Sequence, residues 1–206
     1  MTSRRTILLG TASLALAPVL SVRGALAQTV PGTANPMGDV WLGSPDAKVT
    51  IVEYASLTCG HCATFHRDTW PALKAKYIDT GKVRFVLREF PLDPYATAGF
   101  MLARCNGNDK YYAMTDLLFD QQRNWAFTEN PRVALQNLVK QAGYTEASFN
   151  ACLQRQDLYD AVNKVKEGGT QAGVDSTPTF FINGQKRSGA LSMAEFDKIL
   201  APLVGS

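Results

Sequence analysis

The sequence predicts an α/β domain that is interrupted by an all-helical insertion. Residues 48–92 follow a strand, helix, strand order, in which two apolar runs flank a segment with apolar residues at helical spacing. Residues 93–172 carry one helix start signal after another, and a strand pattern returns after Gly173. A sheet covered by helices fits the two outer segments. We therefore assign 48–92 and 173–206 to one α/β domain and 93–172 to a helical insertion.

The first 27 residues have the pattern of a secretory signal. A short basic region with two arginines precedes an uncharged run at 6–22, and an Ala-Leu-Ala sequence at 25–27 offers a cleavage site. The arginine pair resembles the twin-arginine type of signal, and an ordinary Sec signal is the alternative. An uncleaved membrane anchor fits less well, because the run is short for a spanning helix and contains a glycine and a proline. We expect an exported, periplasmic protein.

Charge gives no indication of a nucleic acid or membrane partner. Removal of residues 1–27 takes away three arginines and no acid, which leaves 18 basic and 18 acidic side chains. A balanced charge provides no electrostatic attraction for nucleic acid or an anionic lipid surface. Residues 28–47 are expected to form a leader with a short edge strand at 40–42.

The first part of the α/β domain is built around two cysteines. A strand is predicted at 48–54, a helix from Cys59 to about Tyr77, and a second strand at 83–90. Pro71 predicts a break in this helix near Thr69. The cysteines then follow the carboxyl end of the first strand, where open α/β sheets bind their ligands. The buried stripe of the helix is predicted to be Phe65, Thr69, Leu73 and Tyr77.

The insertion is predicted to contain five helices. Asp93-Pro94 and Asn130-Pro131 each combine a capping side chain with proline at the first helical position, and Thr145 caps a third segment. The expected helices are 94–106, 109–121, 131–142, 146–153 and 156–172. Beyond the insertion, 179–182 and 185–188 are expected to form a hairpin through Asn183-Gly184. A capping box at Ser192 opens a last helix.

Cys59 and Cys62 are the first candidates for chemistry. A cysteine at a helix N-terminus is favoured as a thiolate, and a partner three positions further on can close a disulfide with it. The helix dipole contributes up to about 2 kcal/mol, and one pKa unit is about 1.4 kcal/mol. The dipole therefore lowers the Cys59 pKa by little more than one unit, and turn N–H groups or His61 must add to it. On spacing alone, half of a zinc site or a chance pair remains open. His66 is expected to be a structural residue at the polar edge of the helix.

Two further cysteines lie in the insertion. Four cysteines allow three pairings, and the proximity of Cys59 to Cys62 leaves Cys105 and Cys152 as the remaining pair. Two buried free thiols are the alternative, which an oxidising compartment disfavours. A second catalytic pair is a further alternative.

A proline stands at the entrance of the predicted strand at 179–182. Proline cannot donate a hydrogen bond within a sheet, so Thr177-Pro178 requires a turn, which a cis peptide bond would supply. A plain turn with a proline is the alternative interpretation.

Taken together, these motifs resemble the DsbA-like branch of the thioredoxin superfamily. The resemblance rests on Cys-Gly-His-Cys at 59–62 after a strand, Val-Asp-Ser-Thr-Pro-Thr-Phe-Phe-Ile-Asn-Gly at 174–184, and a helical insertion between them. It covers essentially the whole chain after residue 27. It implies a thioredoxin fold with an inserted all-helical domain.

The resemblance also implies roles for individual residues. Cys59 matches the nucleophile that forms a mixed disulfide, and Cys62 matches the buried partner that resolves it. His61 matches the residue that stabilises the Cys59 thiolate. Glu53 matches a buried acid that exchanges protons with the active site, although a surface carboxylate is its alternative interpretation. Thr177 and Pro178 match the cis-proline loop that binds substrate backbone.

The expected function is an exported thiol:disulfide oxidoreductase, specifically a dithiol oxidase. Its substrates would be folding exported proteins with free thiols, and a DsbB-like membrane protein would re-oxidise it. The Cys59-Cys62 disulfide would be the redox group, with no further cofactor and no metal. Gly-His between the cysteines, where enteric DsbA has Pro-His, leaves the redox poise open over roughly −270 to −120 mV.

Two alternatives remain, of which only the second belongs to another functional class. A disulfide isomerase or reductase is the nearest one. Dedicated bacterial isomerases carry a dimerisation domain ahead of the fold, and only about 12 residues separate Gln28 from Val40, so we expect a monomeric oxidase. The second is a metal-handling or holdase module, against which stands the need of zinc for four ligands.

Overall fold

A four-stranded mixed sheet forms the centre of the protein. The computed structural model describes residues 31–205, and the predicted signal at 1–27 lies outside them. The strands are β1 (Val49–Ala55), β2 (Val83–Glu89), β3 (Thr179–Ile182) and β4 (Gln185–Ser188), in the order β2-β1-β3-β4. β1 pairs in parallel with β2 and antiparallel with β3, which pairs antiparallel with β4. The predicted strands and the hairpin are therefore confirmed.

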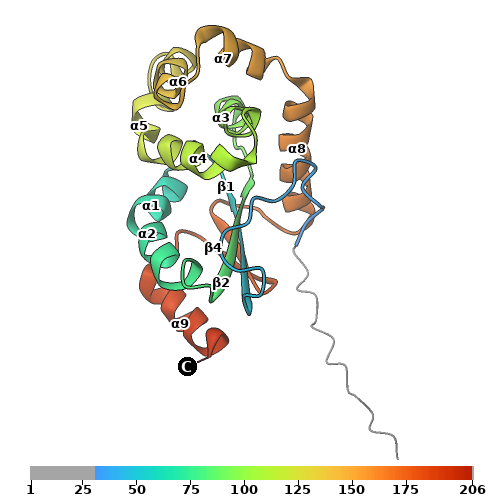
Figure 1. Cartoon of the computed structure of the whole chain (residues 1–206), viewed down its shortest axis with the longest axis vertical. Helices are drawn as coiled ribbons and strands as arrows, with labels where there is room; N and C mark the ends of the chain where they lie inside the picture. Colours follow the sequence, from blue (N-terminus) through green and yellow to red (C-terminus); the bar gives the residue numbers. More distant parts are fainter. Residues whose placement is uncertain (1–30, 206) are drawn as a thin grey trace, which may run out of the picture.

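Helices cover both faces of this sheet (Figure 1). α1 (Gly60–Asp68), α2 (Trp70–Leu73), the π-helical turn at Lys74–Ile78 and α9 (Met193–Val204) lie on one face, and α8 (Gln156–Gln171) lies on the other. Successive residues of a strand point to opposite faces. Ile51 and Ala55 accordingly pack in the core on the α1 side, whereas Val52 and Tyr54 pack in a second core on the α8 side. Glu53 has the same parity as Ile51 and Ala55, so its side chain points toward α1.

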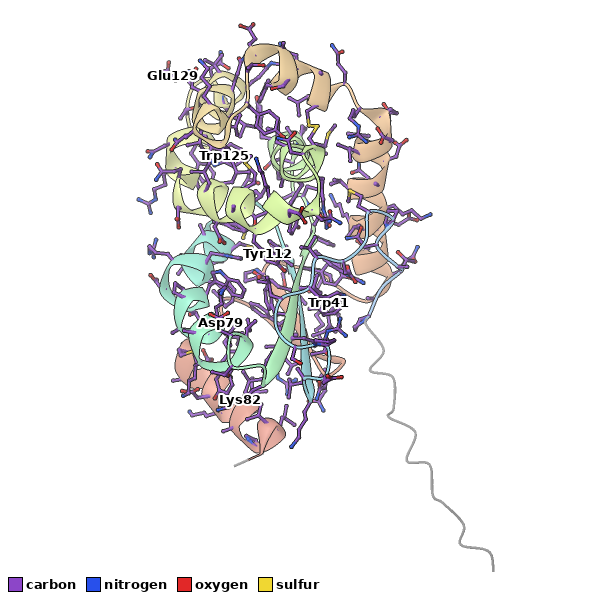
Figure 2. All side chains as sticks on the ribbon, in the orientation of Figure 1. Trp41, Asp79, Lys82, Tyr112, Trp125 and Glu129 are labelled. Carbon is purple, nitrogen blue, oxygen red and sulfur yellow. A yellow bond between two sulfur atoms is a disulfide. The ribbon has the colours of Figure 1, made fainter. Side chains whose placement is uncertain are left out.

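The segment from 94 to 153 gathers at one end of the sheet. Its helices are α3 (Pro94–Cys105), the 3₁₀ turn Asn108–Lys110, α4 (Tyr111–Asp120), α5 (Gln122–Trp125), α6 (Pro131–Val139), the 3₁₀ turn Lys140–Ala142 and α7 (Glu146–Leu153). α3 lies among the others (Figure 1). In Figure 2, Tyr112 lies where these helices meet the sheet. Its hydroxyl accepts from Leu87 N of β2 at 3.1 Å and donates to Val40 O at 2.8 Å.

α8 takes part in both regions. Leu158 and Val162, nearer its start, belong to the core that continues into the helical segment, and Val165 belongs to the core on the far face of the sheet. The helix packs against both α3 and β2. A single helix thus joins the insertion to the sheet.

The helix starts follow the capping signals of the sequence. Asp93 accepts from Tyr95 N and Ala96 N, and Asn130 accepts from Val133 N. Thr145 and Ser192 each form a reciprocal capping box. Each of these side chains satisfies N–H groups that a helix leaves without internal partners, which is why these boundaries were predictable.

The predicted break in the helix from Cys59 to Tyr77 is present at Thr69, between α1 and α2. Pro71 has no N–H to donate to the preceding turn, so regular helix cannot run through it. The predicted stripe of Phe65, Thr69, Leu73 and Tyr77 is buried, with every member at most 5% exposed.

One expectation about secondary structure was wrong, and one short helix was missed. The edge strand at 40–42 is reduced to an isolated bridge between Leu42 and Phe85, because Gly43 turns the chain away at a φ of +87°. The short helix α5 was not predicted, since four residues without a capping side chain give no signal. Within residues 31–205, no helix is long and apolar enough to span a membrane.

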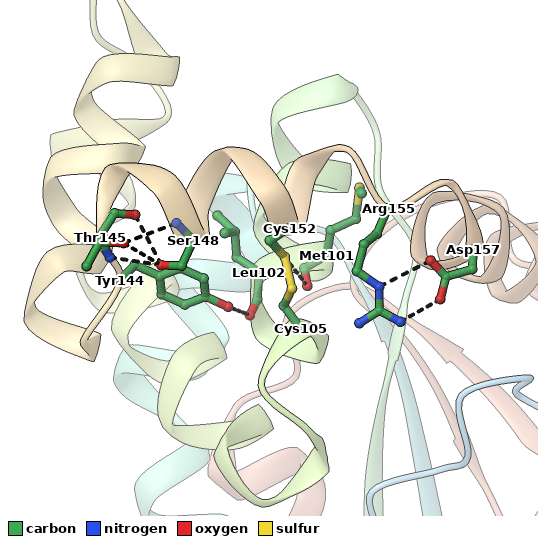
Figure 3. The surroundings of a disulfide bond; sticks show 9 residues. All are labelled: Met101, Leu102, Cys105, Tyr144, Thr145, Ser148, Cys152, Arg155 and Asp157. Carbon is green, nitrogen blue, oxygen red and sulfur yellow. Dashed lines mark hydrogen bonds and ion pairs between the residues drawn. A yellow bond between two sulfur atoms is a disulfide. The ribbon is translucent and has the colours of Figure 1, made fainter.

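A disulfide joins Cys105 at the end of α3 to Cys152 in α7, with the Cα atoms 5.9 Å apart (Figure 3). This is the pairing that the sequence predicted. Nearby, the Tyr144 hydroxyl donates to Leu102 O at 2.6 Å, which ties the segment before α7 to α3 as well. The bond closes a loop that contains α4, α5 and α6.

Candidate active site

The loop after β1 places Cys59 at the start of α1. Cys59 is the N-cap residue, with φ −83° and ψ 119°, and its carbonyl accepts from Ala63 N at 3.1 Å. Its own N–H donates to Ser56 O at 3.1 Å. The unpaired N–H groups of the first turn therefore point toward the Cys59 side chain, which favours negative charge there.

The helical segment holds this loop from the other side. Gln122 of α5 is buried and donates from Nε2 to Leu57 O at 2.8 Å and to Cys59 O at 3.0 Å. The Thr58 hydroxyl donates to Asp93, the residue that caps α3. Sequence reasoning missed Gln122, because its relation to Cys59 depends on packing across 63 positions of the chain.

The sulfur of Cys59 is a half-buried group in contact with the proline corner. Its thiol donates to Thr177 O at 3.3 Å. Its pKa is lowered to about 5, first by a hydrogen bond from the Cys62 thiol, then by the Thr177 side chain and the backbone N–H groups of Cys62 and His61, while burial acts in the opposite direction. Cys59 is therefore suited to carry negative charge at neutral pH.

Cys62 has the opposite environment. It lies one turn into α1 and is 0% exposed. Burial is the main cause that raises its pKa well above the ordinary value, and its hydrogen bond to Cys59 and the charges of Cys59 and Glu53 act in the same direction. One pair of cysteines thus combines an accessible thiolate with a buried thiol.

His61 contributes through its backbone. Its side chain is exposed, and no hydrogen bond joins its imidazole to residues 31–205. The backbone N–H of His61 helps to lower the Cys59 pKa. The stabilising contact expected of this residue is therefore made by its main chain.

Glu53 and His66 form a buried pair behind the cysteines. Glu53 is 0% exposed, and its Oε2 lies 3.2 Å from His66 Nε2. The His66 ring stacks on Phe119 with ring centres 3.9 Å apart. His66 was expected to be a structural residue at the polar edge of the helix, but it is 4% exposed, because α4 covers that face of α1. The alternative interpretation of Glu53 as a surface carboxylate is excluded by its burial.

The corner at Thr177-Pro178 stands against the cysteines. The peptide bond between these residues is cis. Pro178 O accepts from Gly189 N at 2.9 Å, which fixes the corner to the segment after β4, and Thr177 O faces the Cys59 sulfur. Two segments 118 positions apart in the sequence thus meet at a single sulfur atom.

Comparison with known proteins identifies the family. The family model described as "Thioredoxin" matches residues 35–201. The crystal structure of alpha-DsbA1 from Wolbachia pipientis is 30% identical, with a TM-score of 0.74 over 81% of this chain and 90% of that chain. This chain belongs to the DsbA-like branch of the thioredoxin superfamily.

Other relatives agree with this assignment. A Rickettsia bellii protein named "Putative protein-disulfide oxidoreductase" is 34% identical over 148 residues, which are 71% of this chain and 57% of the relative. The chain thus spans little more than half the length of that curated relative. BdbD from Bacillus subtilis, 21% identical with a TM-score of 0.71 over 85% of this chain and 97% of that chain, shares the fold.

The metal-binding alternative requires a group of His, Cys, Asp or Glu side chains that could coordinate an ion. Among residues 31–205, no group of three or more His, Cys, Asp and Glu side chains is arranged to hold a metal ion.

Proposed function

We propose that this protein is an exported thiol:disulfide oxidoreductase that acts mainly as a dithiol oxidase. One observation carries the proposal: a half-buried Cys59 with a pKa of about 5 stands beside a fully buried Cys62 whose pKa is raised. Thiol-disulfide exchange needs an accessible sulfur that is both a good leaving group and a target for attack. Cys59 meets both requirements.

In the proposed reaction, a substrate thiolate attacks Cys59 Sγ of the oxidised pair. A bond forms between the substrate sulfur and Cys59, the Cys59-Cys62 bond breaks, and Cys62 leaves and takes up a proton. A second substrate thiolate then attacks the first substrate sulfur and releases Cys59 as a thiolate. The substrate loses two electrons and the cysteine pair gains them, so the pair itself serves as the redox group.

The direction of the reaction follows from the Cys59 thiolate. Contacts that stabilise the thiolate exist only in the reduced protein, so they favour reduction of the Cys59-Cys62 pair and oxidation of the substrate. A low leaving-group pKa also speeds release of Cys59 from the mixed disulfide. Both effects support an oxidase over a reductase.

The proline corner is the proposed contact for substrate backbone. Thr177 O lies 3.3 Å from the Cys59 sulfur, so a peptide that reaches this sulfur must pass along the corner. A hollow beside the first turn of α1 is lined by Gly60, Ala63, Phe119 and Phe127 and by the polar or charged residues Thr64, Arg67, Asp120, Gln122, Arg123 and Asn124. Phe127 is 63% exposed, so this mixed surface offers an apolar contact beside polar groups to an unfolded polypeptide.

Turnover requires re-oxidation, for which we propose a DsbB-like membrane protein as the partner. The predicted signal at 1–27 would bring the enzyme to the periplasm, where exported chains acquire disulfides. The name of the Rickettsia relative, "Putative protein-disulfide oxidoreductase", supports thiol-disulfide exchange as the activity.

Two measurements test the proposal. The first is the pH dependence of Cys59 alkylation in the reduced protein, for which we expect a midpoint near pH 5. A midpoint near that of free cysteine, about 8.5, would contradict the proposal that the protein is a strong oxidant.

The second measurement compares oxidative refolding of reduced ribonuclease, recovery of scrambled ribonuclease and reduction of insulin. We expect the first activity to dominate, and dominance of either other activity would assign an isomerase or reductase.

A further inference from the structure

The buried pair of Glu53 and His66 takes no part in the exchange steps described above, yet its geometry is well defined. Glu53 comes from β1 and His66 from α1, and both side chains are at most 2% exposed. Trp70 and Phe65 contact the imidazole in addition to the Phe119 stack. The ring therefore keeps Nε2 directed at Glu53 and Nδ1 directed away from it.

Three polar atoms in this region are buried and lack a hydrogen-bond partner among residues 31–205. They are Glu53 Oε1, His66 Nδ1 and Asp116 Oδ1. A buried polar atom without a partner costs roughly 1–3 kcal/mol, so such atoms are rare and require an explanation. Glu53 and His66 are in contact, and the charges of both act on Asp116. Three such atoms on interacting groups indicate a function other than stability.

The groups around His66 are also coupled electrically. The charge of Glu53 raises the Cys62 pKa. Burial raises the pKa of Asp116, with the charge of Glu53 adding to this effect and that of His66 opposing it. Asp116 lies on α4 and is only partly buried, so it is the member of the set nearest to solvent.

The surroundings of the imidazole are otherwise aromatic. Glu53 on β1 and Asp116 on α4 are the acidic groups coupled to it, and Phe65, Trp70 and Phe119 supply the ring contacts. The charges of Lys74 and Asp120 act on Asp116 from the surface. Cys62, Glu53, His66 and Asp116 thus form a series of ionisable groups from the buried sulfur toward the outside.

We propose that His66 is a positioning residue that passes protons between Glu53 and the Asp116 side of α4 whenever Cys62 changes its protonation state. This inference rests on the proposed function, because it concerns the step in which Cys62 reacts. During re-oxidation, Cys59 is held in a mixed disulfide with the re-oxidising protein, and Cys62 loses its S–H proton to the Glu53 carboxylate. The Cys62 thiolate attacks Cys59 Sγ, so that the Cys59-Cys62 bond forms, the bond to the re-oxidant breaks and the re-oxidant's sulfur leaves as a thiolate. Glu53 passes the proton to His66 Nε2, and His66 releases a proton from Nδ1 toward Asp116 and solvent. The same path in reverse supplies the proton when Cys62 is the leaving group.

The two cysteines can be followed separately with Ellman's disulfide reagent at one equivalent of reduced protein. Attack by the Cys59 thiolate releases the first aromatic thiolate and leaves a mixed disulfide on Cys59. Attack by Cys62 on that mixed disulfide releases the second and closes the Cys59-Cys62 bond. The first phase reports the Cys59 thiolate, on which the proposed function depends, and the second reports deprotonation of Cys62.

In His66→Gln, an amide can still donate to Glu53, but it cannot carry a proton from one atom to the other. We expect the second phase to slow about tenfold or more between pH 6 and 8, as for loss of a general base. The deficit should vanish at high pH, where hydroxide removes the Cys62 proton directly. The first phase should keep the wild-type pH profile.

Control variants separate a proton path from a structural role. Asp68→Asn alters an exposed position on the same helix and should leave both phases unchanged. Asp116→Asn, which does not touch the His66–Glu53 contact, should slow the second phase in the same pH range, and it tests the path even if His66→Gln fails to fold. The second phase of the double variant Glu53→Gln/His66→Gln should be no slower than that of Glu53→Gln alone, because both residues act in one proton path.

Second-phase profiles of His66→Gln and Asp116→Asn that superimpose on the wild type would overturn the inference while leaving the proposed function intact. A second phase in His66→Gln that is slowed equally at every pH would also overturn it and indicate loss of packing. Failure of the proposed function would appear instead in the first phase of the wild-type protein, as a loss of reactivity below neutral pH.

Discussion

The side-chain amide of Gln122 donates a hydrogen bond to the main-chain carbonyl of Cys59 at 3.0 Å. A residue of the helical segment therefore holds the backbone that carries the reactive sulfur. The same amide nitrogen binds Leu57 O at 2.8 Å, so the whole loop between β1 and α1 depends on it.

Gln122→Met should lower stability and loosen this loop. The change leaves two carbonyls of the loop without their donor, and we expect a loss of about 1–3 kcal/mol in the free energy of unfolding. Urea unfolding of the oxidised protein would measure it. The matched control is Arg123→Met, which alters the exposed next residue of α5 and should change stability by no more than about 0.5 kcal/mol. Equal stabilities for the two variants would contradict the role assigned to Gln122.

The stability of the reduced protein should fall as the pH is lowered from about 8.5 to 5. The Cys59 pKa is about 5 in the folded protein and about 8.5 in an unfolded chain. A group with a lowered folded pKa stabilises the fold fully above its unfolded pKa and loses that effect as pH falls through the folded pKa. The slope from one group is at most about 1.4 kcal/mol per pH unit, and solvent screening of this half-buried sulfur makes it smaller.

Urea unfolding of the reduced protein at several pH values would measure this dependence. Cys59→Ser, unfolded under the same conditions, should lack the slope. Above about pH 8.5 the stability should fall again as the pH rises, because the raised pKa of Cys62 costs stability once Cys62 ionises in the unfolded chain.

Cys62→Ala should move the alkylation midpoint of Cys59 upward, since the Cys62 thiol is the largest cause of the low Cys59 pKa. An unchanged midpoint would show that other contacts determine it.

Removal of the disulfide at Cys105 and Cys152 should lower stability without affecting exchange at Cys59. The two cysteines are 47 positions apart, and closure of a loop of this length contributes roughly 4 kcal/mol in the chain-entropy model. Chemical denaturation of a double Cys→Ala variant at these positions would measure the loss. Its first-phase rate with Ellman's reagent should equal that of the wild type, and a slower phase would indicate that α3 and α7 influence the active-site loop.

Gly60→Ala and Gly60→Pro should each be tolerated. Gly60 is the first residue of α1, and a Cβ built there meets no atom within 4 Å. Proline suits this position because its N–H would have no partner within the helix. The backbone donors that lower the Cys59 pKa belong to His61 and Cys62, so the substitution removes neither of them. We expect a gain of about 0.4–1 kcal/mol in unfolding free energy and an alkylation midpoint that stays near pH 5.

Thermal or urea unfolding of both Gly60 variants would check this expectation. A loss of stability in the proline variant, together with a gain in the alanine variant, would mean that the Gly60 N–H has a role in the loop.

Local signals explain how much of the fold was predictable. Capping residues such as Asp93 and Ser192, the break at Pro71 and the hairpin at Asn183-Gly184 act within a few positions of the elements that they define. The cysteine pair at 59 and 62 is equally local. For these features, the residues that decide the structure are neighbours in the sequence.

The parts that were missed depend on packing between distant segments. His66 lies on the same helix as the cysteines, but its burial results from Phe119 of α4, and its partner Glu53 comes from β1. Gln122 lies in a helix of four residues without a capping side chain. No periodicity or short motif marks such residues, because their contacts form only when the insertion folds back onto the sheet.

The uninterrupted course of α8 restricts how the two halves of the molecule can move. Leu158 of this helix lies in the core that the helical segment shares with the α1 face of the sheet, and Val165 lies in the core on the opposite face of the sheet. If the helical segment moves away from α1 to admit a polypeptide, α8, on the opposite side of the sheet, would act as the hinge. This movement would strain two contacts between the helical segment and the loop before α1, Gln122 with Cys59 and Asp93 with Thr58. The same contacts hold the reactive sulfur in place.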